Sequence, residues 1–138
     1  MPKQSPVPDE VSKPFWDACN QQRLVVQTCT ACHRKQHPPE PKCYACGSDE
    51  HLEWCELSGR GKIHSYTKMH DSRIKTLREE QPFIIALIEM EDDPEIKMFS
   101  HLPGTPIDGD VPLGATVQVE FEETPTTGQK VAEWRVVG

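Results

Sequence analysis

The chain has 138 residues and a formal net charge of −7, from 22 acidic and 15 basic side chains. This length holds one domain, or one core with a small appended module, and excludes two large domains. The acidic balance argues against a broad surface for nucleic-acid phosphates. Because no run of eighteen apolar residues occurs and the first ten residues lack the apolar core of a signal peptide, we predict a cytoplasmic protein without a membrane span.

The first segment combines a flexible arm with a short helix. Residues 1–11 carry three prolines and few apolar groups, which is typical of a loosely held, extended arm. A helix then begins at Ser12, whose hydroxyl can accept a backbone N–H as an N-cap, with Pro14 in the first turn. This helix places Phe15 and Trp16 roughly on one side, and we expect them to be exposed. It is too short to be stable alone.

Two Cys-x-x-Cys pairs follow in the stretch CTACHRKQHPPEPKCYACG. A β-branched run at 23–29 leads into the first pair, and a second strand-like piece at 52–59 follows the second. Two tight turns of this kind deliver four thiolates to one tetrahedral metal ion. The predicted ligands are Cys29, Cys32, Cys43 and Cys46. We predict a closed structural zinc site, with no position for a substrate.

Some alternatives remain open for these two cysteine pairs. Gly47 follows the second pair and tolerates a positive φ, and His33 occupies the equivalent place after the first pair. A ligand set that includes His33 or His37 is conceivable. The spacing does not separate zinc from an iron site of the rubredoxin type. We interpret Cys19 and Cys55 as small core residues and not as nucleophiles.

From Gly59 onward the pattern changes to strands. The predicted strands are 63–69, 83–90, 96–102, 115–121 and 131–137. The run at 83–90 is apolar except for Glu89, which suits a strand buried on both faces. Five strands without a helical pattern between them predict a mainly β protein that ends in an OB-type barrel, with a small β-sandwich as the alternative. We therefore divide the chain into an arm (1–11), a helix with a rubredoxin-like zinc ribbon (12–57) and a barrel (58–138).

The common catalytic signatures are missing from the sequence. It contains no phosphate-binding glycine loop, no nucleophile elbow and no His-Glu-x-x-His helix. His64, His70 and Asp71 would supply a base and an orienting carboxylate, but histidines scattered on strands are mostly structural or solvent-facing. We predict no catalytic residue and infer that the chain is not an enzyme by itself.

The polar connection at 69–82 is the best local candidate for an anionic ligand or a partner, because connections of this length between strands are often functional. The basic residues in or beside it are Lys68, Arg73, Lys75 and Arg78. In the alternative interpretation it is a solvated loop, whose charge Glu79 and Glu80 partly cancel.

Four stretches resemble a known family: PFWDACNQQRLVVQTCTACHRKQHPPEPKCYACGS, WCELSGRGKIHSYT, PFIIALIEMED and LGATVQVEFEE. The most specific motifs are the Phe-Trp helix start, Arg-Leu-x-x-Gln-x-Cys, the Pro-Pro before the second pair, and Ser-Gly-x-Gly-x-x-x-Ser-Tyr-Thr. This family has an N-terminal helix, a rubredoxin-like zinc ribbon and an acyl-CoA-associated OB-fold, and was long catalogued as a domain of unknown function. The resemblance runs from Pro14 to Val137. It departs at His33, where many relatives have glycine, and in the longer charged segment 70–81.

The resemblance implies a non-catalytic accessory subunit of a thiolase-superfamily complex. Such a subunit docks to a thiolase-fold partner in a hetero-oligomer and helps enclose acyl-CoA during thiolytic or retro-aldol C–C cleavage or formation. Coenzyme A is then a ligand shared with the partner, and Phe15 and Trp16 are the expected interface anchors. Residues expected near the phosphates of coenzyme A or near the partner are Arg34, Lys35, Lys68, Arg73, Lys75 and Arg78.

A second function uses the same fold. Zinc ribbons and OB barrels also bind single-stranded nucleic acid, through basic grooves and stacking aromatic rings. The chain has three Trp, two Tyr and four Phe and a net charge of −7, so it offers few stacking rings and no basic stripe. A rubredoxin-like electron carrier is a third and weaker hypothesis.

Overall fold

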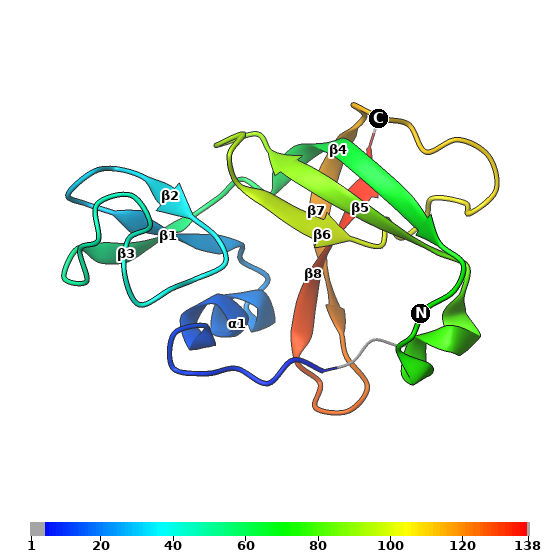
Figure 1. Ribbon diagram of the computed structural model, residues 1–138, viewed down its shortest axis with the longest axis horizontal. Coiled ribbons are helices and arrows are strands. Elements are labelled where there is room, and N and C mark those ends of the chain that lie inside the picture. Colours follow the sequence, from blue (N-terminus) through cyan, green and yellow to red (C-terminus); the bar gives the residue numbers. More distant parts are fainter. Residues whose placement is uncertain (1–4, 138) are drawn as a thin grey trace.

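The structure is a computed structural model that describes residues 5–137, and it confirms a mainly β chain with one short helix at the N-terminus. The elements are α1 (Lys13–Asn20), β1 (Val25–Cys29), β2 (Lys35–Gln36), β3 (Leu52–Glu56), β4 (Arg60–Met69), the 3-10 helix η1 (Lys75–Glu80), β5 (Phe83–Met90), β6 (Lys97–Ser100), β7 (Thr116–Glu123) and β8 (Lys130–Val136). The small sheet lies at one end of the molecule, and the barrel lies at the other (Figure 1). Within residues 5–137, no helix is both long and apolar enough to cross a membrane.

Helix α1 begins as predicted at Ser12 with a proline in its first turn, but the predicted N-cap bond is wrong. Ser12 has helical backbone angles, φ −88° and ψ −14°, and its side chain makes no cap bond. These angles turn the hydroxyl back toward the preceding turn, where it accepts the Asp9 N–H at 3.0 Å. The Asp9 carboxylate in turn accepts the Ser12 N–H at 2.7 Å. This reciprocal pair fixes the entry into the helix.

The predicted arm, residues 1–11, falls partly outside the described residues, which begin at Ser5. The Ser5 hydroxyl donates to Thr124 Oγ1 at 2.6 Å and accepts the Thr127 N–H at 3.1 Å. These bonds attach the arm to the turn between β7 and β8. The flexibility of the arm stays a prediction, but it has this anchor on the barrel.

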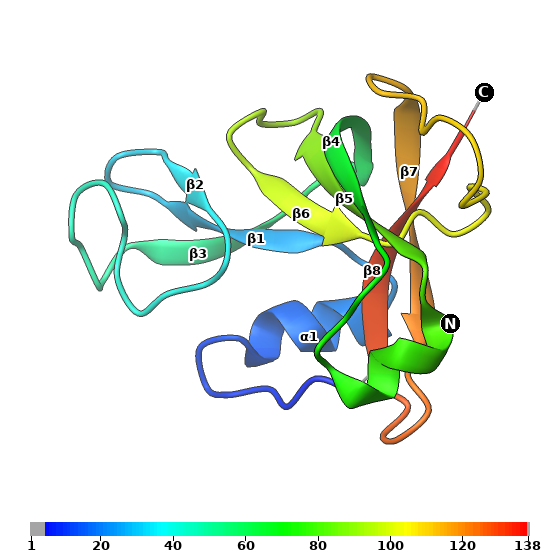
Figure 2. The same ribbon diagram turned by 45° about the vertical axis from the view of Figure 1, so that its right-hand side comes forward.

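Helix α1 packs beside β8 and below the small sheet, as two views show (Figures 1 and 2). Gln129, just before β8, donates to the carbonyl of Trp16 at 3.0 Å, and its side-chain oxygen accepts from Asn20 at 3.2 Å. Phe15 lies in the core and is only 6% exposed, whereas Trp16 is half-buried. The expectation of an exposed aromatic pair is therefore wrong for Phe15, because its ring fills the space between helix, ribbon and barrel.

The small sheet has the order β2-β1-β3, with antiparallel pairing on both sides of β1. It carries the two cysteine turns at one end. At its other end, the Leu57 N–H donates to the Leu24 carbonyl at 2.8 Å. This bond joins the end of β3 to the segment that follows α1, immediately before the chain enters the barrel.

The five barrel strands have the order β6-β5-β4-β7-β8, and all neighbours are antiparallel. The two end strands, β6 and β8, are linked by side chains. The Ser100 hydroxyl accepts the Trp134 N–H at 2.9 Å, and the buried Glu133 carboxylate accepts the His101 N–H at 2.7 Å. The barrel is thus nearly closed, which confirms the OB-type prediction over the β-sandwich. The bounds of β5 are those predicted, although alternate residues of the strand are only half-buried.

One apolar core runs from α1 and β1 through the barrel. Its largest fully buried side chain is Trp134, whose indole N–H donates to the Gly59 carbonyl at 3.1 Å. Gly59 has φ +81°, and a Cβ there would lie 2.3 Å from Val119 Cγ1. A Cβ on Gly61 would lie 2.5 Å from the Glu89 carbonyl oxygen. The Ser-Gly-x-Gly motif is therefore required by close packing at the start of the barrel.

Candidate functional site

The four predicted ligand cysteines come together at one end of the small sheet. Their sulfur atoms all lie within 4.8 Å of one another. The Cys29 and Cys46 sulfurs are 3.7 Å apart, and those of Cys32 and Cys43 are 3.5 Å apart. Tetrahedral zinc with Zn–S bonds of about 2.3 Å requires sulfur separations of about 3.8 Å. The residues present therefore fit a four-thiolate metal site.

The two cysteine turns repeat the same local geometry. The His33 N–H donates to the Cys29 carbonyl at 2.7 Å, and the Gly47 N–H donates to the Cys43 carbonyl at 3.0 Å. His33 has φ +66° and Gly47 has φ +76°. Both residues thus adopt the left-handed conformation that the sequence predicts, and histidine accepts it at a modest steric cost.

Backbone amides prepare the sulfurs for a metal. Although the Arg34 N–H lowers it, the pKa of the Cys32 thiol is raised to about 11 by its hydrogen bonds to the other cysteines and by burial. The Cys46 N–H, followed by the Ala45 N–H, points at the Cys43 sulfur and lowers the pKa of that thiol to about 6. A thiol with this pKa is mainly thiolate at neutral pH, which is the form that binds metal ions. Cys29 and Cys43 are buried, whereas Cys32 and Cys46 are exposed. The site therefore lies at the surface of the ribbon, with two of its sulfurs covered.

Neither candidate histidine joins the sulfur cluster, which among the described residues contains only cysteines. His33 is exposed. The ring of His37 instead packs against Phe15, with ring centroids 5.0 Å apart. Burial lowers the pKa of His37 to about 4, so this imidazole is neutral at pH 7. Its Nδ1 is buried without a hydrogen-bond partner among the described residues.

Two buried glutamines that the sequence reasoning overlooked hold the second cysteine turn in place. Gln27 is 5% exposed and Gln36 is 2% exposed. Gln36 donates to Gln27 Oε1 at 2.8 Å and to the Lys42 carbonyl at 3.0 Å, and it accepts the Tyr44 N–H at 2.8 Å. Gln27 exchanges two bonds of 2.9 Å with the backbone of Glu40. These side chains attach the 40–44 segment to β1 and β2, and the glutamine of the Arg-Leu-x-x-Gln-x-Cys motif was the available signal.

The two other cysteines lie away from the cluster. Cys19 is fully buried in the core, as predicted, and burial raises the pKa of its thiol to about 12. Cys55 is half-buried on β3 and its sulfur accepts the Thr28 hydroxyl at 2.8 Å. The surroundings of both cysteines are those of small interior residues.

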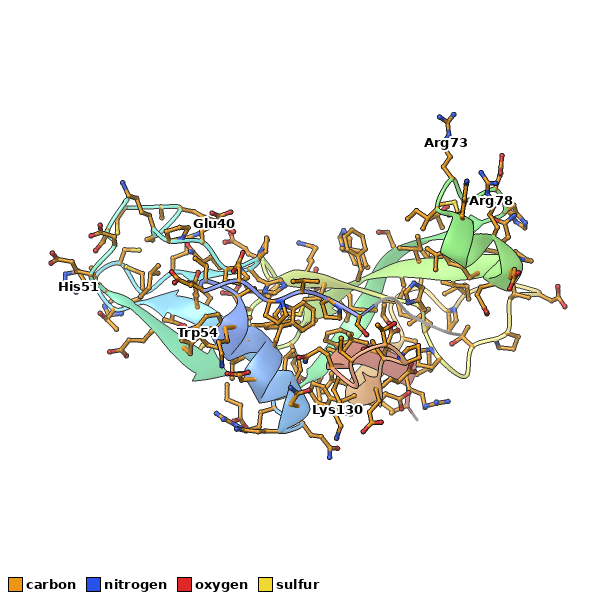
Figure 3. The ribbon with its side chains drawn as sticks, turned by 90° about the horizontal axis from the view of Figure 1, so that it is seen from below. Glu40, His51, Trp54, Arg73, Arg78 and Lys130 are labelled. Atoms are coloured by element: carbon orange, nitrogen blue, oxygen red, sulfur yellow. The ribbon has the colours of Figure 1, made fainter. Side chains whose placement is uncertain are left out.

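The six predicted basic contact residues are not brought together. Arg34 and Lys35 lie in the ribbon, and the Arg34 guanidinium is 3.2 Å from a carboxylate oxygen of Glu95, in the turn between β5 and β6. The other four belong to the opposite end, where Arg73 and Arg78 project beside η1, far from Glu40 and His51 of the ribbon (Figure 3). One phosphate group cannot contact both sets.

Within the second basic set, two side chains are engaged with the backbone. Lys68 donates to the Gly109 carbonyl at 2.5 Å, and Arg78 donates to the Ser72 carbonyl at 3.1 Å. Arg73 and Lys75 are exposed. These two cations are therefore the more accessible members of the set.

The structure does not bring His64, His70 and Asp71 together in a buried site. His64 lies at the irregularity between β4 and β5, and its Nδ1 is 3.6 Å from a carboxylate oxygen of Glu89. His70 and Asp71 are exposed in the connection that follows β4. This arrangement fits solvent-facing side chains.

Both halves of the chain match family profiles. Residues 16–51 match the rubredoxin-like zinc ribbon domain of ChsH2, and residues 54–122 match the C-terminal OB-fold domain of ChsH2. The chain is thus a zinc ribbon and OB-fold protein. It belongs to the ChsH2 family, also called DUF35.

Two curated relatives are similar over about three quarters of this chain. A "probable enoyl-CoA hydratase alpha subunit" of Thermomonospora curvata is 33% identical over 112 residues, which is 79% of this chain but 33% of the relative. A "DUF35 domain-containing scaffold protein" of Methanocaldococcus jannaschii is 28% identical over 108 residues, which is 76% of this chain and 72% of the relative. The chain spans only a third of the first relative's length.

Solved structures extend the likeness to nearly the full chain. A chain in a structure titled "Ltp2-ChsH2(DUF35) aldolase" superposes with a TM-score of 0.81 and 27% identity, covering 96% of this chain and 98% of that one. A DUF35 protein of unknown function from Sulfolobus solfataricus has a TM-score of 0.62 and 19% identity, with 93% and 86% covered. The second likeness concerns the fold alone.

Proposed function

We propose that this chain is a non-catalytic accessory subunit of a thiolase-superfamily complex that acts on acyl-CoA. It docks to the thiolase-fold subunit and helps enclose the acyl-CoA while the partner cleaves or forms a C–C bond, by a thiolytic or retro-aldol reaction. The observation that supports this proposal is the likeness over 96% of the chain to a chain of the structure titled "Ltp2-ChsH2(DUF35) aldolase". The name "scaffold protein" of an archaeal relative supports the same role.

The chemistry of the cysteine site supports a structural part in such a complex. Four thiolates complete the coordination of zinc, so that a bound ion would have no open position for a substrate or a catalytic water. When bound, the ion supplies folding free energy to the ribbon. The reactive groups then belong to the partner, and the complex works in the cytoplasm.

We also propose a contact between this chain and the phosphates of coenzyme A. Because the six basic residues are divided between two ends, we assign the phosphate contact to the barrel end, where Arg73 and Lys75 are exposed. Arg34 is already paired with Glu95. Trp16, half-buried on α1, remains our aromatic interface anchor.

A co-purification tests the proposal. The tagged chain is expressed at native level and isolated, its companions are identified by mass spectrometry, and the eluate is assayed for zinc. We expect a thiolase-type subunit in fixed ratio and about one zinc per chain. The recovered enzyme is then assayed with and without this chain. Unchanged activity and coenzyme A affinity in its absence would sink the proposal, and recovery of nucleic acid alone would favour the single-stranded nucleic-acid alternative.

A further inference from the structure

A pocket of 410 Å³ lies where helix, ribbon and barrel meet. Its walls come from α1, from the His37–Pro39 segment of the ribbon, and from the strands β6 and β8. Phe15 and Trp16 form the helix side, and Trp134 lies at the barrel side. Apolar and aromatic side chains make up most of this lining, which is the composition of a binding pocket and not of a solvated surface.

The pocket lies beside β6 and β8, the two end strands of the five-stranded barrel sheet. β6 and β8 stand at the two ends of the five-strand order, so each is paired along one side only. Ser100 joins them through the Trp134 N–H, and the pocket lining includes Met98 and Phe99 of β6 and Val131 and Ala132 of β8. An end strand beside an apolar pocket suits an added protein segment, because one side of such a strand is not paired in the sheet.

The rim of the pocket carries an exposed aromatic ring and a cation. Phe99 is 71% exposed, whereas Tyr44 is 50% exposed. Lys97, two residues earlier on the same strand, is the one fully charged residue among the described residues of the lining. Its ammonium donates to the neutral Pro94 carbonyl at 3.0 Å, so its charge is not neutralised by that bond. Such a rim is complementary to an apolar segment that carries a carboxylate.

The ribbon holds the third wall in place. Gln27 bonds the backbone of Glu40 in both directions, and the Tyr44 hydroxyl donates to the Pro38 carbonyl. The segment that forms this wall is therefore attached to the second cysteine turn. Through this connection the ribbon also fixes the shape of the pocket.

We propose that this pocket is the site that receives the thiolase-type partner. An apolar segment of the partner packs on Phe99 and Trp16 and enters the pocket, and a carboxylate of that segment meets Lys97. The inference rests on the proposed function and goes beyond it by naming the docking face and the chemistry of the partner segment.

The test measures binding of the thiolase-type subunit, recovered with the tagged chain, to four purified forms of this chain by titration calorimetry. We expect Phe99→Ala to weaken binding at least about tenfold. Lys97→Glu is expected to weaken it about fivefold at low salt and less at high salt. Leu113→Ala is the matched control, because Leu113 is 61% exposed but does not line the pocket. It should bind like the parent.

The outcomes separate the two proposals. If the parent binds and Phe99→Ala binds equally well, the docking face is wrong and the proposed function stands. If no thiolase-type subunit is recovered or bound, the proposed function fails and takes the inference with it. Sedimentation of the free chain tests the other occupant: a dimer that Phe99→Ala converts to a monomer would assign the pocket to a second copy and overturn the inference. Phe99 is exposed, so loss of fold does not mask the result.

Discussion

The ribbon and the barrel are stabilised by different means. In the ribbon, Val26 of β1 reaches the shared apolar core, and the other buried residues include Gln27, Gln36 and two cysteines. In the barrel they are mainly large apolar side chains, such as Ile88 and Trp134. A small sheet with so little apolar surface cannot offset its conformational entropy by burial alone. The ribbon therefore depends on metal ligation and on a satisfied polar network, whereas the barrel contains most of the shared apolar core.

Removing one metal ligand is the strongest test of this difference between ribbon and barrel. Cys43→Ser should reduce bound zinc from about one per chain to nearly none and unfold the ribbon, because structural zinc binding contributes roughly 10–16 kcal/mol in small zinc domains. The barrel should stay folded. Zinc content together with amide hydrogen exchange measures both regions. Cys55→Ser is the control, since Cys55 is a half-buried cysteine outside the sulfur cluster. Loss of exchange protection in the barrel of Cys43→Ser would show that the two regions fold as one.

A substitution in the barrel core should have the opposite effect: it should destabilise the barrel and leave zinc binding intact. Trp134→Ala removes the largest fully buried side chain and its bond to the Gly59 carbonyl, and should cost about 3–5 kcal/mol. Chemical denaturation followed by circular dichroism measures this loss. Zinc content at low denaturant should stay at the parent level. A variant that loses its zinc before the barrel unfolds would contradict the independence of the ribbon.

The predictable parts of the fold are those with a strong local signal. The strand at 83–90 is an apolar run interrupted only by Glu89, and its bounds are confirmed. The spacing of the cysteines brings four sulfurs together as predicted. Gly47 and His33 have the predicted positive φ because a Cys-x-x-Cys turn requires it. In each case the decisive information lies within a few neighbouring residues.

The parts that could not be predicted depend on contacts distant in sequence. Phe15 looked exposed because a helix alone does not show that ribbon and barrel cover its ring. The role of Gln36 was not predicted, because its backbone partners at Lys42 and Tyr44 lie across a turn from it. The basic residues looked like one set, although Arg34 and Arg73 are at opposite ends of the fold.

The glutamine network gives a smaller test of the ribbon. Gln36→Leu keeps a similar volume but leaves the Lys42 carbonyl and the Tyr44 N–H without their partner, which should cost roughly 2–3 kcal/mol. Because these bonds hold the second cysteine turn, zinc affinity measured by competition with a chelator should fall as well. Gln21→Leu is the control, since Gln21 is exposed. Parent-like zinc affinity in Gln36→Leu would show that the metal alone organises the turn.

His37 at the junction predicts a pH dependence. Burial lowers its pKa from 6.5 to about 4. Above pH 6.5 the ring is neutral in both states, and as the pH falls toward 4 the unfolded chain binds a proton that the folded chain does not. Stability is therefore lost in this window, by about 2 kcal/mol at pH 5. His37→Phe should lack this part of the acid sensitivity. Denaturation of both proteins at pH 7.5 and pH 5, with zinc content checked at each pH, measures the difference.

The smallest expected effect concerns the contact between ribbon and barrel. Arg34 and Glu95 form an ion pair across the two regions, but both side chains are about half exposed or more. Solvent screening limits such a pair to roughly 0.2–1 kcal/mol. A double-mutant cycle with Arg34→Ala and Glu95→Ala measures this coupling. A coupling energy near zero would mean that the shared apolar core around Phe15, and not this ion pair, holds the two regions together. A value of several kcal/mol would mean that the pair is far less screened than its exposure implies, and that the ribbon is oriented on the barrel by charge.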